Sequence, residues 1–334
     1  MSIEFNYTTK TLKSTPAISS GSVFGELDKD IVYTFSGKSS LTLLLRYYQH
    51  IGKLKDRSDQ ILVPQWLGDP VYMVMHEHCF PTTFMNEKVK GIMVYHQWGF
   101  PQDMDYIKKF CEDNKLFFIE DCAHTHESYY KGQRLGTFGE SSFFSLGKFF
   151  SSVVGGSIYT QSDSIKKFIE EKFQEDDEKL STEVFNRRHN FDVSSTQENV
   201  IELRRDYAVY SKLLKCPEYS LAISQQEVAG GAMLKRRAHY ELYKKAFGGS
   251  KYLSDLIKED VVPWVVPLFF DEIKNKKVVS ALRDAGIKTG VYHFDVNRNM
   301  FKPDFKECVP LPCHQGMTTE DVLKVIDIVK CVTE

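Results

Sequence analysis

Short apolar runs alternate with helical patterns across the first half of the chain. Gly91 to Tyr95 and Leu116 to Ile119 are typical of buried strands, and the segment between them, Asp103 to Asn114, has the pattern of a helix. Strands that are apolar throughout are characteristic of parallel sheets with helices on both faces. The sequence therefore predicts an α/β protein built on a mostly parallel sheet.

Further elements are predicted on both sides of this segment. Before it lie a helix from Leu41 to Ile51, beginning just after Gly37-Lys38-Ser39-Ser40, then a short strand, Ile61 to Val63, and a second helix through Met75. After it, two strands, Ser142 to Leu146 and Ser157 to Thr160, flank a loop that carries Lys148.

The second half of the chain is helical and then returns to α/β. Residues 162–246 are highly charged and helical in pattern, with Ser162 as the expected N-cap. A second unit follows, with a strand at Trp264 to Phe270, a helix, a strand at Lys288 to Phe294, and a last helix after a Thr318/Asp321 capping box.

Composition excludes several classes of protein. Lysine and arginine number 43 against 45 acidic residues, so the net charge of −2 does not favour nucleic acid as a partner. Seven scattered cysteines without a CxxC pair suit reduced thiols better than a disulfide framework. No apolar run approaches the length of a membrane span, and the N-terminus has no signal-peptide pattern, so we expect a cytoplasmic protein without membrane insertion.

Two motifs suggest chemistry that the spacing does not support. Gly37-Lys38-Ser39 resembles the end of a phosphate-binding P-loop, but Val32 stands where the motif needs its first glycine. What remains is a small-residue turn at a helix N-terminus, which serves either as a plain cap or as a phosphate site. His76, His78 and Cys79 lack the ligand pairs of a closed zinc site, and we predict no metal.

The most informative stretch combines an acid at a strand end with a lysine in apolar surroundings. Asp121 follows a buried strand, where open α/β sheets bind ligands, although an acid there can also be a turn cap. Lys148 lies between Leu146 and Phe149, and such surroundings lower the pKa of an amine and free its lone pair to attack a carbonyl. With the helix N-terminus at Gly37, these are the groups that pyridoxal 5'-phosphate requires.

In these segments the chain resembles the DegT/StrS family of pyridoxal-phosphate-dependent nucleotide-sugar aminotransferases, as a shortened, divergent member. The resemblance extends from about Ser36 to Lys330. Its motifs are the SGKSS turn, the VYHQWGFP segment, the IEDCAH segment, the SLGK segment with its later Gly-Gly, and the LPCH segment near the end.

The resemblance implies roles for individual residues. Lys148 would join the cofactor and act as general base, Asp121 would pair with the ring nitrogen, and His124 would contact the side of the 3-hydroxyl. Ser145 matches a phosphate-binding serine but precedes the lysine by three residues rather than the usual five, and Trp66 would face the ring or lie in the core. The remaining expected cofactor contacts are Gly37, Lys38 and Ser39 at the phosphate and, from the neighbouring subunit, Asn190.

The resemblance also implies an architecture. We expect the fold of type-I pyridoxal-phosphate transferases, a large domain whose mostly parallel sheet is sandwiched by helices and a smaller C-terminal α/β domain. The predicted division is a lead segment at 1–30, a large domain at 31–246 and a small domain at 247–334. Because active sites in this fold form between subunits, a homodimer is expected.

The expected activity is transfer of an amino group from an amino acid, L-glutamate, to a nucleotide-linked keto-deoxysugar for amino-sugar and polysaccharide biosynthesis. Relatives with histidine at the lysine position are sugar dehydratases, and Lys148 argues against that activity. Two alternatives remain open: action on another keto substrate, such as an aminocyclitol precursor, and a catalytically silent protein that only binds cofactor or sugar.

Overall fold

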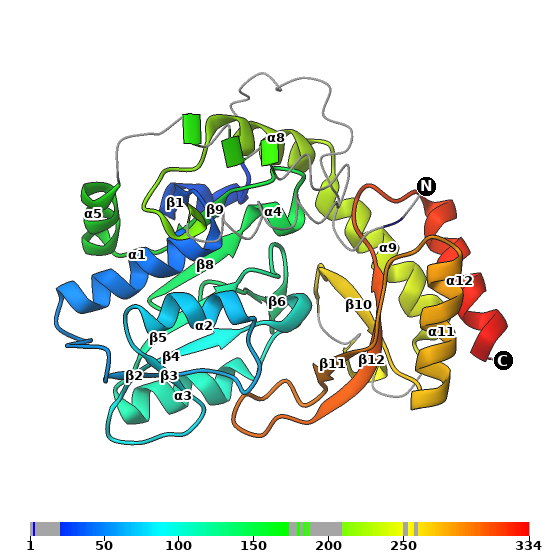
Figure 1. Cartoon of the computed structure of the whole chain (residues 1–334), viewed down its shortest axis with the longest axis horizontal. Coiled ribbons are helices and arrows are strands. Elements are labelled where there is room, and N and C mark those ends of the chain that lie inside the picture. Colours follow the sequence, from blue (N-terminus) through cyan, green and yellow to red (C-terminus); the bar gives the residue numbers. More distant parts are fainter. Residues whose placement is uncertain are drawn as a thin grey trace.

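The architecture is that of a large mixed sheet with helices on both faces, beside a smaller sheet near the C-terminus (Figure 1). The computed structural model describes residues 3, 21–173, 179–180, 183–184, 186–187, 209–249, 253–256 and 260–333. The expected α/β class is confirmed.

The large sheet has seven strands in the order β1-β9-β8-β5-β4-β2-β3. All neighbours pair in parallel except β9, which is antiparallel to both β1 and β8. The strands are β1 (Ile31–Thr34), β2 (Gln60–Leu62), β3 (Phe80–Thr82), β4 (Val89–Tyr95), β5 (Phe117–Cys122), β8 (Ser141–Ser145) and β9 (Gly156–Tyr159). The carboxyl ends of β5, β4 and β8 therefore meet at one edge.

Alternate residues of the central strands point to opposite faces, and both faces are buried. Met93 and Ile119 pack with helices α1 (Gly37–His50), α2 (Asp69–His76) and α5 (Asp163–Lys172). Ile92 and Phe118 pack on the other face with α3 (Met104–Asn114). Burial on both faces explains why these strands are apolar throughout.

The C-terminal sheet has three antiparallel strands in the order β10-β12-β11. These are β10 (Val265–Leu268), β11 (Tyr292–Asp295) and β12 (Phe305–Pro312), covered by α11 (Glu272–Asp284) and α12 (Thr319–Thr333), while α9 (Ala232–Phe247) runs beside the sheet (Figure 1). Near the chain start, Ile3 pairs with Ile287 in the same unit. The division into domains at 30 and 246 stays a prediction.

The remaining elements are short or connect the two sheets. They are η1 (Gly25–Asp30), η2 (Gln97–Gly99), β6 (Tyr129–Tyr130), β7 (Gln133–Arg134), α4 (Leu146–Phe149), η3 (Val209–Ser211), α8 (Glu218–Ala229) and α10 (Leu253–Leu256). Ser162 caps α5 and Thr318 forms its capping box with Asp321, so both predicted caps are confirmed.

Several predicted elements differ from those in the structure, and the strand predicted at Lys288 to Phe294 begins only at Tyr292. Helix α1 begins at Gly37 rather than after Ser40, because Ser36 serves as N-cap and accepts the backbone N–H of Ser39. Lys148 lies on the one-turn helix α4 rather than in a loop, since the backbone N–H of Phe150 donates to the carbonyl of Leu146.

The structure contains strands that the sequence analysis did not predict, among them β1, β3 and β12. In β12 the reason is chemical, because prolines disfavour central strands. Pro310 and Pro312 are tolerated because the pairing with β11 ends at Cys308, leaving these prolines paired on the β10 side. In the part of the chain that the structure describes, every helix is too short or too polar to cross a membrane.

Candidate active site

The candidate site lies at the carboxyl edge of the large sheet, where β4 and β5 end side by side. Tyr95 and Asp121 are register partners at these ends, and both are buried. Asp121 shares the parity of Ile119 and so points to the face that carries α1. The acid therefore lies where sequence analysis placed it, at the end of a buried parallel strand.

Lys148 is brought to the same edge by the turn that follows β8, residues 146–153, which we call the lysine turn. Gly147 permits this turn, because a Cβ there would lie 2.9 Å from the carbonyl oxygen of Val153. Val153 itself has a φ of 65°, a left-handed conformation that is costly for a β-branched residue. The turn is thus a tight, strained structure that the surrounding packing holds in place.

A hydrogen-bonded chain runs from Lys148 through His124 to Tyr95. The amine Nζ of Lys148 lies 2.8 Å from Nε2 of His124, and Nδ1 of His124 lies 2.5 Å from the hydroxyl of Tyr95. The indole of Trp264 stacks flat on the imidazole, with ring centroids 4.2 Å apart and planes 3° apart. Because Trp264 also donates its indole N–H to the carbonyl of Lys148, it links the imidazole to the lysine turn.

Burial shifts the pKa values of these groups toward their neutral forms. Burial lowers the pKa of Lys148, and the carboxylate of Asp121 offsets part of this shift. Burial also lowers the pKa of His124, and the charge of Lys148 lowers it further. Burial raises the pKa of Asp121, against a hydrogen bond from the backbone of Ala123 and the charge of Lys148. An amine with a lowered pKa is the form that attacks a carbonyl.

The first turn of α1 lies against the lysine turn. A methyl group added to Gly37 would lie 3.4 Å from Cβ of Ser145, so two predicted phosphate contacts are adjacent. Lys38 is half-buried, and its pKa is lowered to about 8 by burial and by the charge of Lys148. The hydroxyl of Ser39 is buried and lies 3.0 Å and 2.5 Å from the carbonyl oxygens of Tyr210 and Lys212, so it packs against η3.

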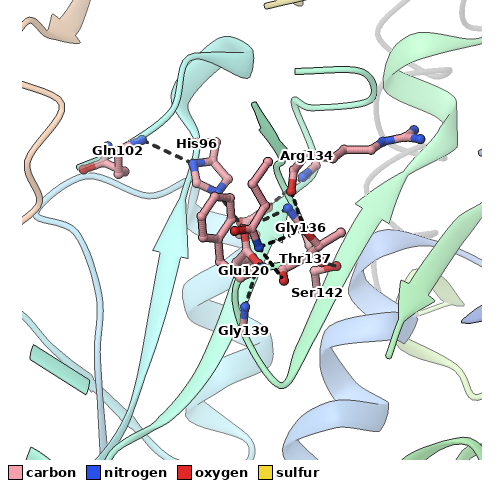
Figure 2. A network of polar contacts seen from close by, with 12 residues as sticks. His96, Gln102, Glu120, Arg134, Gly136, Thr137, Gly139 and Ser142 are labelled. Carbon is pink, nitrogen blue, oxygen red and sulfur yellow. Dashed lines mark hydrogen bonds and ion pairs between the residues drawn. The ribbon is translucent and has the colours of Figure 1, made fainter. Parts of the chain in front are cut away.

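Glu120, next to Asp121, points to the opposite face and holds a loop together. Its two carboxylate oxygens accept the backbone N–H groups of Gly136, Phe138 and Gly139 at 2.6–2.9 Å (Figure 2). His96 lies 3.2 Å from the same carboxylate, and the side chains of His96 and Glu120 are fully buried. His96, Glu120 and Cys122 have a spacing that could suit a metal ion, but the carboxylate is already saturated by hydrogen bonds.

Arg236 belongs to a buried network beside the lysine turn. It is fully buried and donates to the carbonyl oxygens of Phe149, Pro263 and Trp264, and to the side chain of Gln315. Gln315 in turn donates to Glu227, which accepts the backbone N–H of Ser151 at 2.9 Å. This network joins the lysine turn to α8, α9 and the segment before α12.

The remaining predicted site residues are Trp66 and Asn190. Trp66 lies in the loop after β2, at the same edge of the sheet, with 46% of its surface exposed. It is therefore not a core tryptophan, and its contact with a cofactor ring stays a prediction. Asn190 lies outside the described residues. Sequence analysis missed Tyr95 and Trp264, although the VYHQWGFP segment placed Tyr95 at the end of a buried strand.

The residues present fit pyridoxal phosphate. The buried carboxylate of Asp121 has a raised pKa, which a cationic ring nitrogen beside it would reverse. The amine of Lys148 lies at the same edge, and the N-terminus of α1, with Lys38 and Ser145, offers N–H groups and positive charge to a phosphate. The acid, the amine and the predicted phosphate contacts are thus within one site.

The fold and these side chains define the class of type-I pyridoxal-phosphate-dependent transferases. A comparison with family models then narrows the class. The chain belongs to the DegT/DnrJ/EryC1/StrS aminotransferase family, whose model matches residues 82–330. The prediction of a pyridoxal-phosphate-dependent aminotransferase is thereby confirmed.

Individual relatives are distant or match only in part. The uncharacterized protein MJ1066 of Methanocaldococcus jannaschii is 24% identical over 318 residues, which cover 83% of this chain and 80% of that protein. GDP-perosamine synthase of Escherichia coli O157:H7 is 39% identical over 83 residues, only 24% of this chain and 23% of the synthase. The structure of Helicobacter pylori PseC, an aminotransferase involved in the biosynthesis of pseudoaminic acid, superposes with a TM-score of 0.66 at 17% identity, covering 96% and 93% of the two chains.

Proposed function

We propose that this protein transfers an amino group from L-glutamate to the keto group of a nucleotide-linked deoxysugar in amino-sugar biosynthesis, with pyridoxal 5'-phosphate as cofactor. The observation that carries the proposal is the amine of Lys148, held with Asp121 at the carboxyl edge of the sheet. The family assignment and the relatives named for sugar amination support the choice of substrate.

Each residue of the site would have its own role in the reaction. Lys148 would hold the cofactor covalently and, once released, move a proton at the α-carbon of the donor. Asp121 would hold a proton at the ring nitrogen, where its negative charge is adjacent. Gly37, Lys38 and Ser145 would bind the phosphate, and His124 would orient the ring. When bound, the cofactor supplies the electron sink that makes the α-proton acidic.

The site is closed to water on several sides. Asp121, His124 and Tyr95 are all less than 9% exposed, which keeps the local dielectric low and strengthens each charge interaction. We further propose that the site is completed in a homodimer, with Asn190 of the neighbouring subunit at the phosphate.

Borohydride trapping tests the cofactor assignment. The protein purified with pyridoxal phosphate is reduced with borohydride, digested and mapped by mass spectrometry. We expect the pyridoxyl group on the peptide that contains Lys148 and not on Lys38, which lies beside it. A label on another residue, or none, contradicts the assignment.

A substrate panel tests the reaction. Purified protein is incubated with glutamate and a series of nucleotide-linked keto-sugars, with a keto-cyclitol included, and products are read by mass. Amination of a nucleotide sugar supports the proposal, and initial-rate plots at several glutamate concentrations should be parallel, because one site alternates between two substrates. Amination of the cyclitol alone would select the aminocyclitol alternative. A bound chromophore that glutamate does not change indicates a silent binding protein.

A further inference from the structure

Tyr95 has no role in the proposed reaction, yet it is buried at the centre of the site. Its hydroxyl is 2.5 Å from Nδ1 of His124, whose other nitrogen is 2.8 Å from the amine of Lys148. The imidazole of His124 thus links the phenol of Tyr95 to the amine of Lys148. The protonation of its two nitrogens therefore decides which way every hydrogen bond in the chain points.

Nε2 of His124 either accepts or donates, and this gives two patterns that satisfy the distances. In one, Lys148 donates to Nε2, as an ammonium or as a neutral amine, and Nδ1–H donates to the oxygen of Tyr95. In the other, the hydroxyl of Tyr95 donates to Nδ1, and Nε2–H donates to the lone pair of Lys148, which must then be a neutral amine. The first pattern accommodates a buried cation, whereas the second requires all three groups to be neutral.

The surroundings favour the neutral pattern. Burial raises the pKa of Tyr95 well above its usual range, the nearby Asp121 adds to this, and a hydrogen bond from the backbone of Trp98 offsets part of it. A backbone donor to the phenolic oxygen leaves the hydroxyl proton for Nδ1 of His124. The stacked indole of Trp264 keeps the imidazole in the plane in which both contacts are made.

The charged groups around Lys148 act in both directions. Lys38 on α1 carries a like charge and disfavours the ammonium, whereas Asp121 on β5 favours it. Burial outweighs the attraction of Asp121, because the pKa of Lys148 remains below its ordinary value. A hydrogen bond from Nε2–H of His124 further stabilises the neutral form of the amine.

We propose that Tyr95 is a positioning residue that donates its hydroxyl proton to Nδ1 of His124, fixing the imidazole as the Nε2–H tautomer and so holding Lys148 as a free amine. The inference deepens the proposed function, because it explains how the nucleophile is kept ready before the cofactor binds. It concerns the protein's own residues and can be tested without turnover.

The tautomer of His124 tests the inference directly. The full-length chain is labelled with ¹⁵N-histidine, freed of cofactor and studied by long-range ¹H–¹⁵N NMR, with the His124 signal assigned by its loss in His124→Gln. We expect the Nε2–H form in the wild-type protein. The Nδ1–H form would overturn the inference, and this measurement does not depend on any tyrosine variant folding.

The pKa of Lys148 gives a second test. It is measured by competitive acetylation over a pH series, with the peptide that contains Lys148 read by mass, in the wild type, Tyr95→Phe and Tyr243→Phe. Tyr243 is the matched control, because its buried hydroxyl donates to the carbonyl of Pro312 at 2.9 Å on another element. We expect the pKa of Lys148 to rise by about one unit in Tyr95→Phe, the size of one hydrogen bond, and to stay unchanged in Tyr243→Phe.

Equal pKa values of Lys148 in all three proteins would overturn the inference. A general packing defect would lower the melting temperature without shifting this pKa, so thermal melts of both variants are measured in parallel. Failure of the proposed function is a separate result, since it shows as the absence of a borohydride-trapped label on Lys148 in the wild-type protein.

Discussion

At the scale of single residues, burial is the main cause of the pKa shifts in this site. Lys148 and Lys38 lie close enough for each charge to disfavour the other, and burial lowers the pKa of both. They differ in position: Lys148 contacts His124, whereas Lys38 stands in the first turn of α1 over the ring of Tyr210. We therefore expect one lysine to act as nucleophile and the other as a phosphate contact.

Replacing Lys148 by alanine should abolish amino transfer and leave the fold intact. The nucleophile and proton carrier are lost, while the phosphate contacts at Gly37 and Ser145 remain. Turnover is measured by product mass, and cofactor retention by absorbance after gel filtration. Turnover near the wild-type rate would contradict the role of Lys148.

Replacing Lys38 by methionine should change stability in a pH-dependent way. Its pKa in the fold is about 8 against an ordinary value of 10.5, so between these values the unfolded chain binds more protons and wild-type stability rises with pH. The cost of the buried charge is thus present below about pH 8 and declines as pH rises. We expect the cofactor-free variant to melt at a higher temperature than the wild type at pH 7, with the gain shrinking toward pH 10.

The same substitution should weaken binding of phosphate. Inorganic phosphate should raise the melting temperature of the wild-type protein more than that of Lys38→Met, because the cation at the helix N-terminus is lost. A gain in stability that does not change with pH, or an equal response to phosphate, would rule out this role for Lys38.

At the scale of elements, the one-turn helix α4 has little room for added side-chain atoms. It begins directly after β8, and Gly147 within it approaches the carbonyl oxygen of Val153 so closely that a Cβ would lie 2.9 Å away. The backbone N–H of Leu146 also donates to the carbonyl of Gly155 at 2.9 Å. In the Gly-Gly segment, Gly155 has a φ of 123°, and a Cβ on Gly156 would lie 2.2 Å from the carbonyl carbon of Ser36. The backbone therefore requires glycine at these positions.

Gly147→Ala should displace the lysine turn. We expect a loss of about 1–3 kcal/mol in the free energy of unfolding, the usual cost of overpacking, together with a lower yield of borohydride-trapped cofactor at Lys148. Gly249→Ala is the control, because a Cβ there has no neighbour within 4 Å. Equal stability and equal trapping in both variants would show that the turn can relax without cost.

At the scale of the whole molecule, the buried Arg236 connects parts that are far apart in the sequence. Its guanidinium lies 4.8 Å from the centroid of the Phe149 ring and donates to carbonyl groups of the lysine turn and of the segment before β10. Glu227 and Gln315 complete the network. The position of Lys148 therefore depends on side chains from α8, α9 and the residues before α12.

The neighbouring arginines allow a matched comparison. Arg236→Met should lower the free energy of unfolding by about 3–5 kcal/mol, because Glu227 and several carbonyl groups lose a buried cationic partner. Arg237→Met should cost less than about 1 kcal/mol, because Arg237 pairs with Asp260 at the surface. Urea unfolding measures both, and equal losses would contradict the role of the buried network.

The helices and strands could be predicted from the sequence where a single apolar pattern dominated. The buried strands β4 and β5 and the helix between them followed from apolar periodicity, since both faces of the sheet are covered. β12 was not predictable, because its prolines oppose a central strand and only the end of the pairing with β11 makes them tolerable. The start of α1 was misplaced because Ser36, rather than a later serine, supplies the cap.

The sequence by itself determined the class of fold and predicted two groups for the chemistry, Asp121 and Lys148. Both are local signals, an acid after an apolar strand and a lysine among apolar neighbours. Only the tertiary structure decided which side chains surround that lysine. Tyr95, His124 and Trp264 are separated by up to 169 residues along the chain, and their contacts arise from strand register and from a segment that returns from the C-terminal half. No pattern within a window of sequence encodes contacts of that kind, because they depend on how distant elements pack.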